Sequence, residues 1–146
     1  MKYHQGARFA LLFVLITIIA VSKPSSATGN VNKGDLAGPW QMTVIGETGC
    51  GFGTTLYKFT LNANGVATNV SGTSHTAGCG DTTSGGNTFT ITNLNANGSG
   101  AAGLTCGTGC GWSLNIQVSP DRTTFNVTDV SSANPNNFIE GVAIHQ

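Results

Sequence analysis

The feature that most constrains the fold is an alternation of apolar and polar residues with a period of two, which recurs through residues 38–146. Such alternation is typical of β-strands with one buried and one solvated face. The clearest run is "WSLNIQV" at 112–118. It predicts eight strands, of which the fifth, "SGAAGLT", has weak strand propensity and irregular structure as its alternative. The expected ranges are 39–47, 54–61, 66–74, 87–94, 99–105, 111–118, 123–130 and 137–145.

The apolar members of the alternation define the expected interior, and the opposite face is mainly Thr, Ser, Asn and Gln. β-Branched threonine suits a pleated strand and its hydroxyl suits water, so this second face is expected to be the solvated one. The expected inward residues are Trp40, Met42, Val44, Tyr57, Phe59, Leu61, Val66, Thr68, Val70, Phe89, Ile91, Trp112, Leu114, Ile116, Val118, Phe125, Val127, Phe138, Val142 and Ile144.

Tight turns and glycine-rich segments alternate between the strands. The tight turns are "NANG" at 62–65 and 95–98 and "SPDR" at 119–122. Asn-Gly accepts a positive φ at both central positions of a hairpin. Glycine-rich loops are expected at 48–53, 75–86 and 106–111. This order predicts an all-β antiparallel up-and-down meander, closed into an eight-stranded barrel that leaves no strand edge; a two-sheet sandwich is the alternative.

The cysteines all fall in the glycine-rich loops. Successive connections of a meander alternate between its two ends, so all four cysteines should lie at one end and the tight turns at the other. Two disulfides are expected in an exported chain, although the sequence permits three pairings. Cys50–Cys79 with Cys106–Cys110 is preferred because the first and third connections, which carry Cys50 and Cys79, are neighbours across the second and third strands. A zinc site is the alternative, but only Cys106 and Cys110 approach zinc-ligand spacing.

Residues 1–27 have the pattern of a cleaved secretory signal. A basic start precedes the apolar run "FALLFVLITIIAV" at 9–21, and small residues, Ser25 and Ala27, lie where a signal peptidase reads. The run is short for a membrane helix, which makes an uncut anchor the alternative. We therefore expect a secreted or periplasmic protein without stable membrane insertion after cleavage.

The remaining chain is expected to hold a flexible segment at 28–37 and one domain at 38–146. Beyond the signal, three basic residues face six acidic ones, a net charge of −3 with neutral histidine. Such a chain has no basic patch, so no nucleic-acid partner is expected. It has no Gly-x-Ser-x-Gly elbow, and we expect neither enzymatic activity nor a cofactor. The oligomeric state is left open.

One short motif carries a family resemblance. Gly38-Pro39-Trp40 resembles the Gly-x-Trp start of the calycins, the lipocalin and avidin group, and "GTGCGWSLNIQV" resembles the Gly-Trp start of an avidin's sixth strand. The resemblance implies an eight-stranded barrel that takes a small ligand at one end. It also implies that Trp40 closes the barrel base and that a basic residue covers its ring. Arg122 and His145 both lie at that end of the chain's meander and are the candidates, the arginine through a cation–π contact. The loop at 131–137 lacks the tryptophan of avidin's biotin site, so biotin is not implied.

The cysteine end would then be the ligand mouth. Tyr57 and Trp112 should point inward there, and by register so should Asp129 and Glu140. Two aromatic rings with two carboxylates suit a polar or cationic small molecule, and the two acids could alternatively form an acid/base pair for glycoside hydrolysis. In the competing interpretation Asp129 only ends its strand and a bulge turns Glu140 outward. His75 is a candidate metal ligand or simply an exposed histidine, and no metal is expected.

Three functions follow from these observations. The first is a secreted barrel that binds a small ligand at its cysteine end. The second is a structural or adhesive surface domain with a filled core, whose neutral Thr/Asn exterior contacts matrix or carbohydrate. The third is a small outer-membrane barrel with its apolar residues outward, although its strands are short for a crossing.

Overall fold

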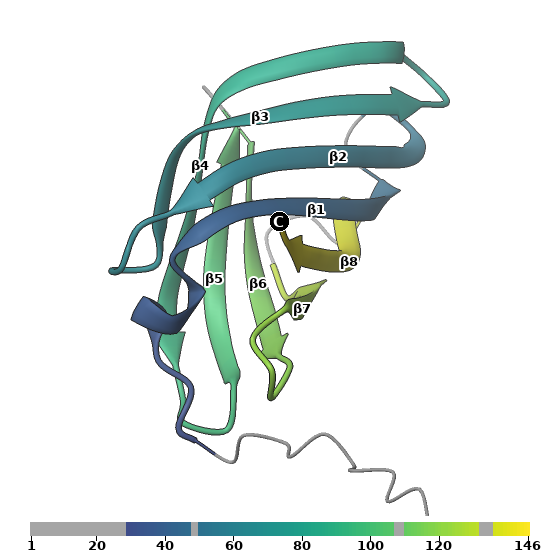
Figure 1. Cartoon of the computed structure of the whole chain (residues 1–146). Coiled ribbons are helices and arrows are strands. Elements are labelled where there is room, and N and C mark those ends of the chain that lie inside the picture. The colour runs from purple at the N-terminus through teal and green to yellow at the C-terminus, as the bar shows by residue number, and fades with distance from the viewer. Residues whose placement is uncertain (1–28, 48–49, 107–109, 132–135) are drawn as a thin grey trace, which may run out of the picture.

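A computed structural model describes residues 29–47, 50–106, 110–131 and 136–146, without the side chains of Cys106 and Cys110. The expected signal at 1–27 lies outside this range. The strands form one closed antiparallel barrel in sequence order (Figure 1), which confirms the up-and-down meander and replaces the sandwich alternative. They are β1 (Gly38–Glu47), β2 (Phe52–Leu61), β3 (Val66–Thr76), β4 (Gly80–Leu94), β5 (Ser99–Cys106), β6 (Cys110–Val118), β7 (Thr124–Asp129) and β8 (Phe138–His145).

The two ends of the barrel carry the connections that the meander requires. Gly65 and Gly98 end the tight turns with φ of 75° and 85°, whereas the asparagines before them have negative φ, so each turn needs one left-handed residue rather than two. At the other end a disulfide joins Cys50 to Cys79 with their Cα atoms 5.5 Å apart, as expected. The side chains of the second expected pair, Cys106 and Cys110, lie outside the described part of the chain.

The second glycine-rich segment is mostly strand rather than loop. β4 is 15 residues long, and its first part pairs with the end of β3, with His75 opposite Asp81 and Thr76 opposite Gly80. Figure 1 shows the two strands running side by side before β4 bends to lie beside β5. The expected loop at 75–86 is therefore wrong, because backbone pairing overrides the low strand propensity of glycine here.

The interior holds most of the residues expected there, and β5 forms despite its weak propensity. The buried core includes Trp40, Phe89, Trp112 and Phe125, and the Thr/Asn face points outward. This is the reverse of the distribution that a membrane-crossing barrel needs. Within the described residues, no helix is apolar and long enough to cross a membrane.

The predicted inward face of β3 is wrong at its start. Ala67 and Val70 are buried, whereas Thr68 is exposed and Val66 is half-buried. The register against β4 shifts between Ala67 and Val70, and Asn69 between them has φ of 59°. This bulge moves the strand's inward positions by one residue, so a strict period of two cannot describe both halves of β3.

The predicted inward face of β8 is also wrong. Ile139 and Ala143 are buried, whereas Phe138, Val142 and Ile144 are exposed by 46%, 37% and 50%. Ala143 lies opposite Met42 on β1 and opposite Phe125 on β7. Two large side chains fill the interior there, which leaves room for only a methyl group between them and turns the larger apolar residues of β8 outward.

The base of the barrel is closed by Trp40, which is 1% exposed. His145 stacks on its ring with centroids 4.7 Å apart, and the indole N–H donates to the carbonyl of Leu36 at 2.8 Å. Arg122 does not stack on Trp40. Its Nε instead donates to Asp35 Oδ2 at 3.2 Å. Gly38, with φ of 138°, leaves room for the His145 ring, which a Cβ would meet.

The segment before β1 is packed against the barrel rather than flexible. Asn32 caps a short 3-10 helix, η1 (Lys33–Leu36), with a reciprocal hydrogen bond to Asp35. Val31 and Leu36 are both buried. Burial of these two apolar residues in the core beside Trp40 explains why this mostly polar segment is ordered.

Candidate functional site

The predicted mouth residues do not assemble as expected. Tyr57 and Trp112 point inward and are 5% and 7% exposed. Burial raises the pKa of the Tyr57 hydroxyl, and a hydrogen bond with Thr55 lowers it by a smaller amount, so the phenol is neutral at ordinary pH. Both rings belong to the buried hydrophobic core.

The two acids of the predicted mouth lie apart. Glu140 is exposed on the outer face, opposite Thr128 of β7 and Ile45 of β1. Asp129 ends β7, half-buried, and accepts hydrogen bonds from the Ser131 backbone N–H at 2.8 Å and hydroxyl at 2.6 Å. Glu140 is turned out by the reversed face of β8 rather than by a bulge. The expected convergence of these two carboxylates is therefore wrong.

His75, the candidate metal ligand, pairs with a neighbouring carboxylate. Its Nδ1 lies 2.7 Å from Asp81 Oδ1, and both side chains are exposed. Across the part of the chain that the structure describes, no three His, Cys, Asp or Glu side chains gather as a metal site would require.

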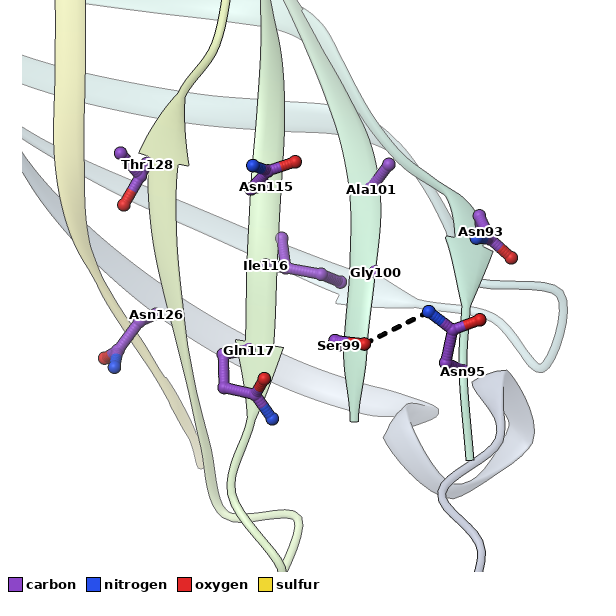
Figure 2. A pocket seen from close by; sticks show the side chains of 10 residues that line it. All are labelled: Asn93, Asn95, Ser99, Gly100, Ala101, Asn115, Ile116, Gln117, Asn126 and Thr128. Atoms are coloured by element: carbon purple, nitrogen blue, oxygen red, sulfur yellow. Dashed lines mark hydrogen bonds between the residues drawn. The ribbon is translucent and has the colours of Figure 1, made fainter. Parts of the chain in front are cut away.

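The outer surface instead carries a hollow of about 520 Å³ across β4, β5, β6 and β7, here called the amide groove (Figure 2). Its lining contains no charged or aromatic residue. Five side-chain amides and two hydroxyls face it from four adjacent strands and, in the case of Asn95, from the turn after β4. The lining residues are Asn93, Asn95, Ser99, Gly100, Ala101, Asn115, Ile116, Gln117, Asn126 and Thr128.

The groove exists because the outward side chains of β5 are small, whereas those of the strands on either side, β4 and β6, are longer. Its outward residues next to the groove are Ser99 and Ala101, and Gly100 lies between them. On β4, Asn93 lies opposite Ala101, and on β6, Asn115 lies opposite Ala101 from the other side. Since neighbouring strands are about 4.8 Å apart, the two walls are about 10 Å apart. A single strand of small outward residues thus forms the floor.

Several groove amides are free to bind a ligand. The side chain of Asn95 donates to Ser99, and Gln117 donates to two backbone carbonyls. In contrast, the side chains of Asn93, Asn115 and Asn126 make no hydrogen bond to any other described residue. Figure 2 shows Asn115 and Asn126 standing on neighbouring strands. Each amide offers a carbonyl acceptor and two N–H donors, the combination that pairs with a hydroxyl group in either direction.

A second, smaller hollow of about 380 Å³ adjoins the amide groove. It crosses β7, β8 and β1 and is lined by Ile45, Asn126, Val127, Thr128, Glu140 and Gly141. Asn126 and Thr128 line both hollows. The two depressions therefore adjoin on the outward face of β7, and Glu140 is the only acid among their lining residues.

The fold and surface define this protein as a disulfide-containing, eight-stranded antiparallel up-and-down β-barrel. Comparisons with known protein families, with curated proteins and with solved structures find no match to the chain. The fold that the calycin resemblance implies is present.

Sequence reasoning did not locate the amide groove, although a signal for it exists. The fifth strand has small residues at consecutive positions, and amide residues alternate along the strands on either side. A small outward column between two amide columns indicates a groove once the strand order is known. The weak strand propensity of these residues bears only on whether the strand forms, and it does not indicate a groove.

Proposed function

We propose that this protein is an extracytoplasmic carbohydrate-binding barrel that uses the amide groove as its binding surface. The observation that carries the proposal is the uncharged lining of free side-chain amides over a floor of small residues. The disulfide supports an oxidising compartment outside the cytoplasm, as does the predicted signal sequence. The buried core favours the outer surface over the barrel interior as the place of binding.

The chemistry of the groove favours a neutral, hydroxyl-rich ligand. A charged ligand would find no counter-charge among the lining residues, and an apolar ligand would leave the amides unpaired. The lining also has no aromatic platform, and each amide–hydroxyl hydrogen bond contributes only about 1 kcal/mol net. A Kd of about 1 mM for a short oligosaccharide is expected, with tighter binding of a polymer by multivalency.

Titration with neutral oligosaccharides, followed by ¹⁵N–¹H NMR, tests this proposal. Shifts should concentrate at the backbone and side-chain amides of Asn93, Asn115 and Asn126. The double variant Asn115→Ala/Asn126→Ala should weaken binding at least about fivefold, because it removes two hydrogen bonds that contribute at least about 0.5 kcal/mol each. Both residues are exposed, so the fold should be unaffected.

A steric variant gives an independent test. Ala101→Leu fills the groove floor without removing any polar group and should also abolish binding. Thr73→Leu is the matched control, since it adds an apolar side chain at an exposed outward position of β3 away from the groove. If a panel of neutral oligosaccharides causes no shifts in the groove at 20 mM, or if Ala101→Leu binds like the parent, the proposal is wrong.

A small ligand inside the cysteine end is the second candidate function, and one buried group favours it. Asn87 is 1% exposed, and its Nδ2 donates to the Ser84 hydroxyl at 3.0 Å. Its Oδ1 is buried and accepts no hydrogen bond from the described residues. An unpaired buried carbonyl costs about 1–3 kcal/mol, which a ligand hydroxyl or amine would offset. The calycin resemblance of Gly38-Pro39-Trp40 supports the same candidate.

The variant Asn87→Val separates the two candidates. It removes the unpaired carbonyl and frees Ser84 to bind water, so it should stabilise the ligand-free fold by about 1 kcal/mol in urea unfolding. It should leave carbohydrate binding in the amide groove unchanged. It should abolish any response of tryptophan fluorescence to small hydroxylated or amine compounds, and the absence of such a response in the parent protein would refute this candidate.

A further inference from the structure

We propose that the carbohydrate bound by this barrel carries free amino groups, one of which is held by Glu140 in the second hollow. This inference rests on the proposed carbohydrate-binding function and names the class of sugar. The ligand would be a chain of amino sugars in which neutral units occupy the amide groove and a protonated amine lies beside the Glu140 carboxylate.

The first argument is that the two hollows adjoin. In the strand register, Asn115 lies opposite Thr128, and Thr128 lies opposite Glu140 on the next strand. Two strand spacings of about 4.8 Å place Asn115 and Glu140 about 10 Å apart along one row. Thr128 between them lines both hollows. A single extended sugar chain can therefore contact both sites without leaving the surface.

The second argument is the shape of the second hollow. Gly141 follows Glu140 directly and contributes only backbone to the lining, packed closely against β1, where a Cβ would meet the Thr43 carbonyl oxygen. Ile45, 41% exposed, forms the opposite side of the hollow and offers an apolar surface to the C–H face of a sugar ring. The hollow thus combines one carboxylate, one apolar side chain and the shared amide of Asn126.

The third argument is uncompensated charge. Glu140 is exposed and has no ion pair among the described residues. Of the basic residues beyond the signal, Arg122 pairs with Asp35, and Lys33 Nζ donates to the carbonyl of Thr92 at 3.1 Å. Lys58 is absent from the lining of both hollows. A cation supplied by the ligand is the complementary group that the hollow lacks.

Paired titrations with two defined sugars test the inference. The probes are the fully N-acetylated tetramer of β-1,4-linked glucosamine and the same tetramer with one terminal unit deacetylated, at pH 5.5 and about 20 mM ionic strength, where the free amine is protonated. The tetramer with the free amine should bind about three- to fivefold more tightly, the upper part of the range expected for one exposed ion pair at low salt. NMR shifts should extend from Asn115 to Glu140 and Gly141.

The variant Glu140→Gln should reduce this preference to less than 1.5-fold, and 0.5 M NaCl should have the same effect on the parent protein. Asp81→Asn is the matched control, because Asp81 is an exposed carboxylate on β4 outside both hollows, and it should keep the preference. Equal affinity for both tetramers, or a preference lost equally in both variants, would overturn the inference and leave the proposed function intact. Binding of neither tetramer and of no neutral oligosaccharide would instead overturn the proposed function itself.

Discussion

The disulfide between Cys50 and Cys79 is predicted to supply a large share of the stability of this barrel. The bonded residues are 29 positions apart, and cross-linking a loop of that length removes about 3.6 kcal/mol of chain entropy from the unfolded state at 25 °C. On the folded side, Gly78 N–H donates to the Cys50 carbonyl at 2.7 Å and Ala77 N–H to Phe52. These bonds hold the two connections together without the sulfurs, so the folded state should change little on their removal.

The double variant Cys50→Ser/Cys79→Ser should therefore lose about 3–4 kcal/mol of unfolding free energy, a sizeable part of the 5–15 kcal/mol typical of domains. Urea unfolding at 25 °C, followed by the fluorescence of Trp40 and Trp112, measures this loss. Both rings lie in the interior and report on the barrel itself.

The predicted second disulfide provides the comparison. Cys106 and Cys110 are direct partners in the strand register and would close a loop of about five residues. The same entropy relation gives about 2 kcal/mol for that ring, so Cys106→Ser/Cys110→Ser should be the milder variant. If the long-ring variant loses less than 1 kcal/mol, or less than the short-ring variant, the assumption that the ring acts on the unfolded state is refuted.

Two further predictions concern the barrel base. Trp40→Phe should cost about 2–3 kcal/mol in urea unfolding, because it removes the buried hydrogen bond to Leu36 and leaves a small cavity beside His145; a loss below 1 kcal/mol would contradict this. At Asp35, a hydrogen bond from the Asn32 N–H lowers the pKa, partial burial opposes the shift, and Arg122 lowers it further. The stability that this carboxylate contributes is complete well above pH 3.8 and is lost as the pH falls through its lower folded pKa. Asp35→Asn should therefore make the free energy of unfolding depend less on pH below about pH 4. An unchanged pH dependence would contradict the assignment.

The alternation and the turns were sufficient to predict the fold because both depend on local chemistry. A period of two places "WSLNIQV" on one face regardless of its neighbours, and Gly65 and Gly98 reverse the chain by their own conformation. Reversals after nearly every strand leave few topologies to choose from, and barrel closure then satisfies the remaining edges.

The errors arose where tertiary packing overrides the local pattern. In β8 the apolar residues occupy both faces, since Ile139 and Ala143 alternate with Val142 and Ile144. Hydrophobicity alone therefore favours neither face, and the larger residues were assigned to the interior. The volume already occupied by Met42 decides otherwise, and that volume is known only after the register is known.

The amide groove also depends on strand pairing that is not local in the sequence, but here the small side chains create the feature instead of filling the interior. Because its outward residues are so small, β5 can add little cross-strand side-chain contact of its own, and its stability depends on backbone pairing with β4 on one side and β6 on the other. Those pairings exist only because the closed barrel supplies a neighbour to both edges. The weakness that made this strand hard to predict is thus the property that leaves a groove at Ala101 between Asn93 and Asn115. A larger outward side chain at that position would strengthen the strand and fill the groove, and binding measured in Ala101→Leu therefore tests the fold and the proposed function together.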